Sequence, residues 1–193
     1  MTTIYFDLET GGIEPRHPSI QLAAIAVDDA TGKELEAFER KLRFDEAAAD
    51  PEALKMNHYD AEVWKRTAVE PALAASDFAR WVKPHSCIEM VSKRTGASYS
   101  VAKLSGYNAL TFDLPRLRAL FGTQFFPCSY HVRDVLQRAM FWFDEHPDVK
   151  KPENLKLGTV CTYFGIPIDG AHEALADVRA TAALAQKLRE VAP

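Results

Sequence analysis

The sequence predicts an α/β fold in which one mixed β-sheet carries helices on its faces. Two observations lead to this prediction. Three strand-like segments follow one another at the start of the chain, and helical patterns then alternate with shorter strand patterns. This order is typical of a mixed sheet covered by helices. No internal repeat, low-complexity tract or linker interrupts the chain, so we expect a single domain over residues 1–193.

The first three strands are predicted from alternating side chains. Residues 3–9 alternate apolar and mostly acidic positions, which places the acidic residues on one face of the strand. Residues 19–28 and 33–44 have further strand patterns, and the turn 28–32 joins them. Short connections of this kind favour an antiparallel meander.

Two helix starts follow the strands. Asp50-Pro51 is a helix N-cap followed by proline in the first turn, and Glu70-Pro71 repeats the device at the start of a helix over residues 70–83. The second helix has an apolar stripe made of Leu73, Phe78, Trp81 and Val82.

The rest of the chain is predicted to alternate between helices and strands. Residues 84–106 contain two alternating runs around a polar turn at 93–96, which predicts an inserted β-hairpin. Later helices are expected near residues 112–121, 133–143, 153–164 and 172–190, with a short strand near 129–132.

Composition excludes several classes of protein. The three cysteines are far apart and have no metal-binding spacing, which argues against a disulfide framework and a zinc finger. No signal peptide or long apolar run is present, so we expect a cytoplasmic protein without a membrane segment. The net charge of −4 offers no general attraction for nucleic acid, although two bound divalent cations would supply positive charge locally.

The acidic pair Asp7 and Glu9 is the first candidate site. Residues two apart on a strand share a face, with Cα atoms roughly 6.6 Å apart. Carboxylates at that spacing could hold two divalent ions, which in two-metal sites lie about 3.5–4 Å apart. A solvated acidic pair at the end of a strand is the alternative.

Two later motifs add candidates. Asp113 lies at a predicted helix start, where interaction with the helix dipole would explain it without a function. His172 and Asp177 begin the last long helix, and a separation of five residues puts them about 140° apart around it. Asp177 could therefore face a metal, while His172 could reach the site as an acid or base. A histidine at a helix start is otherwise usually a surface or capping residue.

Together these motifs resemble a known enzyme family. The segments DLETGG (7–12), GYNALTFDLPRL (106–117) and LGTVCTYFGIPIDGAHEALADVRATAALA (157–185) are similar to the three motifs of the DnaQ-like DEDDh branch of the 3′→5′ exonucleases. The resemblance covers nearly the whole chain, and it implies a ribonuclease H-like fold with a five-stranded sheet.

The resemblance also implies roles for individual residues. Asp7, Glu9, Asp113 and Asp177 would hold two Mg²⁺ or Mn²⁺ ions, and His172 would be the general base. Four converging carboxylates without cations would raise one another's pKa values. The residues expected to contact the terminal nucleotide are Leu8, Thr10, Gly11 and Asn108.

The implied activity is hydrolysis of single-stranded DNA from its 3′ end to nucleoside 5′-monophosphates. Three alternatives stay open: RNA as the substrate, a non-catalytic nucleic-acid-binding protein, and a scaffold for a DNA polymerase, which is the partner that the resemblance suggests. The aromatic runs Phe125-Phe126 and 141–143 could stack bases, but core packing is the simpler interpretation.

Overall fold

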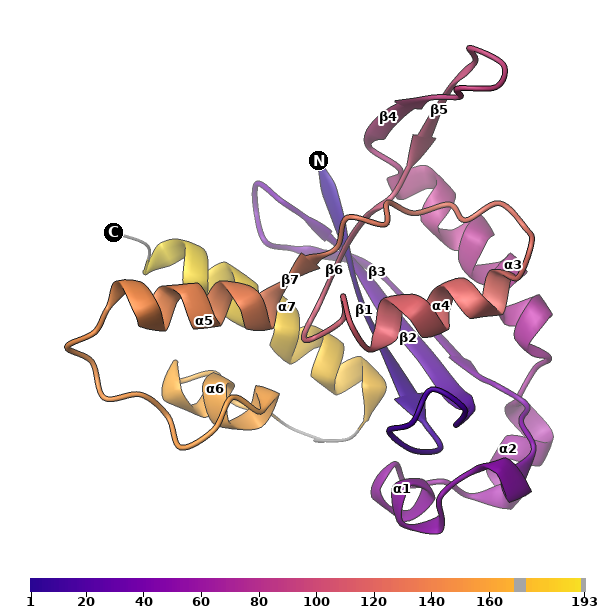
Figure 1. Cartoon of the computed structure of the whole chain (residues 1–193), viewed down its shortest axis with the longest axis horizontal. Coiled ribbons are helices and arrows are strands. Elements are labelled where there is room, and N and C mark those ends of the chain that lie inside the picture. Colours follow the sequence, from indigo (N-terminus) through magenta and orange to yellow (C-terminus); the bar gives the residue numbers. More distant parts are fainter. Residues whose placement is uncertain (169–172, 192–193) are drawn as a thin grey trace.

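A computed structural model of the chain describes residues 1–168 and 173–191, and it contains the predicted mixed sheet. Five strands are ordered β3-β2-β1-β6-β7 (Figure 1). Their bounds are β1 Thr2–Thr10, β2 Ser19–Asp28, β3 Glu34–Lys41, β6 Lys103–Gly106 and β7 Arg133–Asp134. The prediction of a ribonuclease H-like α/β architecture is confirmed.

The first three strands form the predicted antiparallel meander. β1 pairs with β2 from Thr2 opposite Asp28 to Thr10 opposite Ser19, and β2 pairs with β3. Gly32 closes the turn between β2 and β3 with a φ of 70°, a backbone conformation that favours glycine. β6 then adds to the other side of β1 in parallel, so β1 lies at the centre of the sheet.

The described helices follow the predicted order with one addition. They are α1 Pro51–Met56, α2 Ala61–Thr67, α3 Pro71–Val82, α4 Asp113–Phe121, α5 Val135–Glu145, α6 Leu157–Tyr163 and α7 Ala174–Glu190, with short 3₁₀ turns at Glu46–Ala48 and Lys83–His85. The Asp50 side chain caps α1 by accepting a hydrogen bond from the Glu52 N–H, as predicted. Within the described ranges, the structure has no helix long and apolar enough to cross a membrane.

Helices cover both faces of the sheet (Figure 1). On one face, Ile4, Phe6 and Leu8 of β1 share a core with α3 and α4. On the other face, Tyr5 packs into a second core with residues of α5, α6 and α7. The alternation predicted for residues 3–9 is therefore present, but β1 is buried on both faces because it is a central strand.

The hairpin projects from the end of the sheet opposite to α1 (Figure 1). It consists of β4 (Ile88–Val91) and β5 (Ser98–Val101), which pair only with each other. The last part of the predicted insertion, residues 103–106, instead forms β6 of the main sheet. That residues 1–193 form a single functional domain stays a prediction.

Three sequence predictions about local structure are wrong. The short strand expected near 129–132 lies instead at Arg133–Asp134 (β7), after a local turn in which the Ser129 hydroxyl accepts a hydrogen bond from the His131 N–H. Residues 153–156 are not helical, because the Asn154 side chain accepts the Lys156 N–H in a similar turn. Leu73 does not join the apolar stripe of α3 and is 49% exposed.

Helix α2 was not predicted from the sequence. Its N-cap is Asp60, whose side chain accepts a hydrogen bond from the Val63 N–H. The indole N–H of Trp64 donates to the carbonyl of Ile20, which ties this helix to the start of β2. Seven residues with one buried aromatic give too weak a periodic pattern to be recognised without that tertiary contact.

We expect Phe78 to be a principal stabilising residue of the core between α3 and the sheet. Its side chain is fully buried, and its ring packs edge-on against those of Phe38 and Phe121. Phe78→Ala should lower the free energy of unfolding by about 3–5 kcal/mol, because the substitution leaves a cavity. Leu73→Ala on the exposed side of the same helix is the matched control, and similar urea midpoints for the two variants would contradict the assignment.

Candidate active site

The candidate active site is a cleft of about 440 Å³ at the end of β1. Residues from β1, α1, the loop before α4 and the first turn of α7 line it. The structure brings together these residues singled out from the sequence: Asp7, Leu8, Glu9, Thr10, Asn108, Asp113 and Asp177. His172 lies outside the described residues, and Gly11 is not among the lining residues.

Asp7 and Glu9 reach the cleft because they lie on the same face of β1. Asp7 is half-buried and Glu9 is only 9% exposed, so neither is a solvated surface carboxylate. Leu8 between them turns its side chain to the opposite face and packs in the core, as the alternation predicts.

Asp113 enters the cleft from the first turn of α4. It is 3% exposed, and its Oδ1 accepts a hydrogen bond from the backbone N–H of Leu8 at 3.2 Å. This bond joins the start of α4 to the strand segment that carries Asp7 and Glu9. A position at a helix start is thus only part of the explanation for this residue, because its carboxylate is buried against the other acidic side chains.

Asp177 comes from the first turn of α7, which packs across β1 and β2. Its negative charge raises the pKa values of both Asp7 and Glu9. The carboxylates predicted from three separated motifs therefore influence one another in the folded protein.

The electrostatics of the cleft are unfavourable for four ionised carboxylates. Burial and then the charge of Asp177 raise the pKa of Asp7 to about 7. Burial and the charges of Asp7 and Asp177 raise the pKa of Glu9 to about 8. The pKa of Asp113 is also well above its usual value, because burial and Asp7 outweigh the Leu8 N–H and the positive charge of Arg116. Near neutral pH this cleft binds protons unless another positive charge replaces them.

The donor set fits hard divalent cations. Carboxylate oxygens are the preferred ligands of Mg²⁺ and Mn²⁺, and the four carboxylates predicted from the motifs are among the six that line this cleft. In the described ranges 1–168 and 173–191, no three acidic, histidine or cysteine side chains are grouped as a ready-made metal site. Asp7, Glu9, Asp113 and Asp177 are the residues that could hold cations.

The segment that follows β1 is fixed by backbone contacts. The Asn57 side-chain amide donates to the carbonyl of Thr10 at 2.9 Å, and the N–H of Asp50 donates to the carbonyl of Gly11 at 2.6 Å. A Cβ atom on Gly11 would lie 2.7 Å from the Cβ of Ala49, so this position needs glycine for close packing. The predicted contact of Gly11 with substrate stays a prediction.

Asn108 lines the cleft from the loop between β6 and α4, which Asp134 holds. The Asp134 carboxylate accepts the backbone N–H groups of Asn108 and Leu110 at 3.1 and 3.0 Å. Asn108 has a φ of 56°, in the left-handed region that asparagine tolerates better than most residues. The loop therefore presents Asn108 to the cleft in a defined conformation.

Sequence reasoning missed most of the apolar rim of the cleft. Ile13 and Met56 line it and are 83% and 57% exposed, and Tyr107 and Phe112 also line it. The two aromatic residues flank predicted site residues and could have been proposed on that basis. Met56 carries no such signal, because only the docking of α1 beside the end of β1 brings it to the site, whereas Ile13 directly follows the motif at 7–12 and could also have been proposed.

Arg116 connects the two sides of this region. Its guanidinium donates to the backbone carbonyls of Ile13 and Glu14 at 3.0 and 3.1 Å and lies 3.8 Å from the centre of the Phe112 ring. It therefore holds the loop after β1 against the start of α4.

The predicted core packing of the aromatic runs is correct only in part. Phe143 is buried, and Phe126 packs against the core. Phe141 and Phe125 are 64% and 65% exposed, and neither lines the acidic cleft. The expectation that all of these rings belong to the core is wrong for these two.

Comparisons with known proteins identify both the family and the fold. Residues 4–185 match the sequence model of the RNase T family, described as an exonuclease. The fold matches exonuclease I from Methylocaldum szegediense with a TM-score of 0.77 and 20% identity, covering 100% of this chain and 41% of that one. No curated protein sequence matches the chain.

Two structures of E. coli exonuclease I are also similar in fold. One is a complex with a dT13 oligonucleotide, with a TM-score of 0.74 and 24% identity, covering 98% of this chain and 41% of that one. The other is a zinc-bound complex with single-stranded DNA, with a TM-score of 0.75 and 23% identity, covering 98% and 40%. This chain thus spans about two fifths of the length of the structures it matches.

The raised pKa values predict how the stability of the metal-free protein depends on pH. A carboxyl group whose pKa is higher in the folded state stabilises that state below its unfolded pKa, and the stabilisation is lost as pH rises through the folded pKa. For Asp7 and Glu9 the loss falls between about pH 4 and 8. We expect the free energy of unfolding in chelator, measured by urea denaturation, to fall by several kcal/mol between pH 5 and 8.

Asp113→Asn distinguishes repulsion between the carboxylates of the cleft from the titration of groups elsewhere in the protein. The amide oxygen can still accept the Leu8 N–H, while one negative charge is removed. At pH 8 in chelator the variant should melt at a higher temperature than the wild type, and at pH 5 the difference should shrink. A lower melting temperature of the variant at pH 8 would contradict the account of mutual repulsion.

Proposed function

This chain belongs to the RNase T exonuclease family, and we propose on that basis that it removes nucleotides one at a time from the 3′ end of single-stranded DNA. The products would be nucleoside 5′-monophosphates. The observation that carries the proposal is the placement of Asp7, Glu9, Asp113 and Asp177 in one cleft. Raised pKa values supported by burial and charge partners in a cleft are typical of functional sites.

The four carboxylates would hold two divalent cations, Mg²⁺ or Mn²⁺. When bound, such cations lower the pKa of the attacking water and stabilise the charge on the scissile phosphate and the leaving oxygen. The buried position of Glu9 and Asp113 restricts water around the reacting phosphate, which strengthens these electrostatic interactions. The Leu8 N–H and Arg116 restrain Asp113 and the neighbouring loop in position.

His172 is proposed as the general base. An imidazole nitrogen titrates near neutral pH and could accept the proton of the attacking water as the new phosphorus–oxygen bond forms and the bond from phosphorus to the 3′-oxygen of the preceding nucleotide breaks. In the sequence His172 precedes α7, and Asp177 lies in the first turn of that helix. The same segment would therefore supply both the general base and one of the cation ligands.

The rim of the cleft would hold the terminal nucleotide. Ile13, Met56 and Phe112 would supply apolar surface for the base, while the carboxylates of the cleft would lie near the phosphate. Pockets that bind small ligands commonly combine apolar walls with a few oriented polar groups. Asn108, Thr10, the backbone of Leu8 and the Gly11 segment would complete the contacts to sugar and phosphate.

Single-stranded DNA is the favoured substrate. The solved E. coli exonuclease I structures that share this fold hold single-stranded DNA or a dT13 oligonucleotide. Recognition of RNA would require a contact to the 2′-hydroxyl, which none of the motifs specifies. A DNA polymerase partner stays a prediction from the resemblance.

The test of the proposed activity uses purified protein and labelled oligonucleotides. With 5′-labelled single-stranded DNA and RNA of matched sequence, we expect a ladder that shortens one nucleotide at a time in Mg²⁺ or Mn²⁺, and faster for DNA. Chelator should abolish it. A folded protein that gives no ladder on either substrate would contradict the proposal, and faster cleavage of RNA would overturn the choice of DNA.

Asp7→Asn tests the role of the carboxylates. The amide has nearly the same size but loses the charge that would hold a cation, so we expect activity to fall by about 10³-fold or more. The melting temperature should not fall, because the substitution also removes a repulsive charge. Exposed Asp144→Asn is the control. Near-normal turnover in Asp7→Asn would disprove the metal-ligand assignment.

His172→Ala tests the general base. We expect turnover to fall by about 10²–10⁴-fold, with loss of the acidic limb of the pH–rate profile. Stabilisation of the protein by Mn²⁺ in a thermal melt should be unchanged, because the carboxylates remain. An unchanged rate and pH profile would remove His172 from the mechanism.

A further inference from the structure

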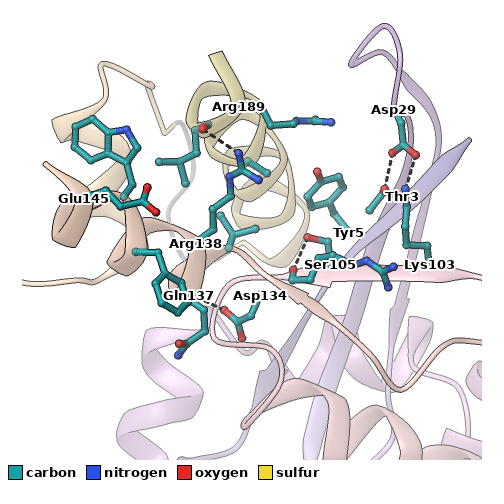
Figure 2. Close-up of a pocket in the computed structure, with 16 residues that line it drawn as sticks. Thr3, Tyr5, Asp29, Lys103, Ser105, Asp134, Gln137, Arg138, Glu145 and Arg189 are labelled. Atoms are coloured by element: carbon teal, nitrogen blue, oxygen red, sulfur yellow. Dashed lines mark hydrogen bonds and ion pairs between the residues drawn. The ribbon is translucent and has the colours of Figure 1, made fainter. Parts of the chain in front are cut away.

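A second, larger cavity of about 760 Å³ lies at the other end of β1. Thr3 and Tyr5 of β1 line it, on the same strand face that carries Asp7 and Glu9 into the acidic cleft. Figure 2 shows the cavity between α5 and α7 on one side and the sheet on the other. None of the residues predicted from the family motifs to act in catalysis or to bind nucleic acid lines it.

One acidic residue of this cavity is paired with a cation, and a second is held by backbone N–H groups that leave its negative charge in place. Asp29 forms an ion pair with Lys103 and accepts the Thr3 hydroxyl. Asp134 accepts backbone N–H groups at the start of α5 and in the loop before α4. The third, Glu145, stands two turns from Arg138 along α5, about 10 Å away along the helix axis.

Three arginines of the cavity form no ion pair with the part of the chain that the structure describes. Arg133 donates to the carbonyl of His131 and Arg138 to the carbonyl of Leu188, while Arg189 stands in the last turn of α7. Among the residues that the structure describes, no carboxylate forms an ion pair with any of the three. The four basic and three acidic residues that line the cavity leave one net positive charge for a ligand.

The arginines surround hydroxyl groups and an aromatic ring. Figure 2 places Arg138 and Arg189 on the helix side of the cavity, with Tyr5 and Ser105 on the sheet beside them. Tyr5 is 5% exposed, and burial raises the pKa of its hydroxyl although the charge of Arg189 opposes the shift. Phe141 also lines the cavity and is 64% exposed.

We propose that this cavity binds the phosphate of a nucleotide, either free or within single-stranded nucleic acid, with the base against Phe141. Arginine guanidinium groups bind phosphate oxygens through two parallel hydrogen bonds, and aromatic rings stack on any base. The volume is within the range of pockets that enclose ligands of nucleotide size. The choice of a nucleotide rests on the exonuclease function proposed above.

This site differs electrostatically from the catalytic cleft. The acidic cleft repels phosphate unless cations are present, whereas the arginine cavity attracts it without them. Binding measured in chelator therefore reports on the arginine cavity and requires no hydrolysis. Failure of this proposal leaves the catalytic proposal intact, and an inactive enzyme could still bind here.

The test measures fluorescence anisotropy of a 5′-labelled oligo-dT strand with the full chain in chelator. Arg189→Gln removes an exposed charge without breaking a described hydrogen bond, and we expect about tenfold weaker binding. Binding should also become less sensitive to salt. The plot of log affinity against log salt concentration should be less steep by about 0.7, because one phosphate contact is lost. Arg138→Gln should weaken binding similarly.

Arg66→Gln is the matched control. Arg66 is exposed on α2 and, like Arg138, donates to a backbone carbonyl without an acidic partner. It should change affinity less than twofold. No binding by the wild type in chelator, unchanged binding by both cavity variants, or an equal loss in Arg66→Gln would overturn the proposal.

Competition by dTMP separates the two sources of phosphate. If dTMP displaces the strand from the wild type, the cavity accepts a single nucleotide. If the strand binds through Arg189 and dTMP does not compete, the ligand is an internal phosphate of the strand. Both outcomes support a phosphate site.

Discussion

The repulsion between carboxylates at the end of β1 is the constraint on which the site depends. Asp7, Glu9 and Asp113 have raised pKa values because they are buried beside one another and beside Asp177. A fold that brings these charges together is less stable near neutral pH than one with neutral residues there. Divalent cations would convert this local instability into binding energy, which is why a metal-dependent reaction is the chemistry that this cleft favours.

The architecture holds the charges together from both faces of the sheet. α4 is anchored in one core through Leu114 and Leu117 and delivers Asp113, whereas α7 is anchored in the other through Val178 and Leu184 and delivers Asp177. The central strand between them carries Asp7 and Glu9. The same strand face leads to arginines at its other end, so a single row of alternate residues connects an acidic site with a basic one.

The features that follow from local sequence were predictable, and those that depend on tertiary contacts were not. Strand alternation placed Asp7 and Glu9 on one face and the helix-start motif placed Asp113 in a first helical turn, but only the resemblance to the exonuclease motifs joined them into one site. The strand expected at 129–132 begins only at Arg133, after a turn in which the Ser129 hydroxyl accepts a hydrogen bond from the His131 N–H. Rim residues such as Met56 and the arginines around Tyr5 come together only through packing of distant elements, for which the sequence has no short-range signal.

The most direct test of the central claim is calorimetric titration of the metal-free protein with Mn²⁺ at pH 7. Because the four carboxylates are proposed to act as one ligand set, the account predicts saturable binding of two ions, markedly weakened in Asp113→Asn although that variant is folded. Absence of saturable binding, or equal binding by the wild type and Asp113→Asn, would contradict the claim that these carboxylates form a cation site.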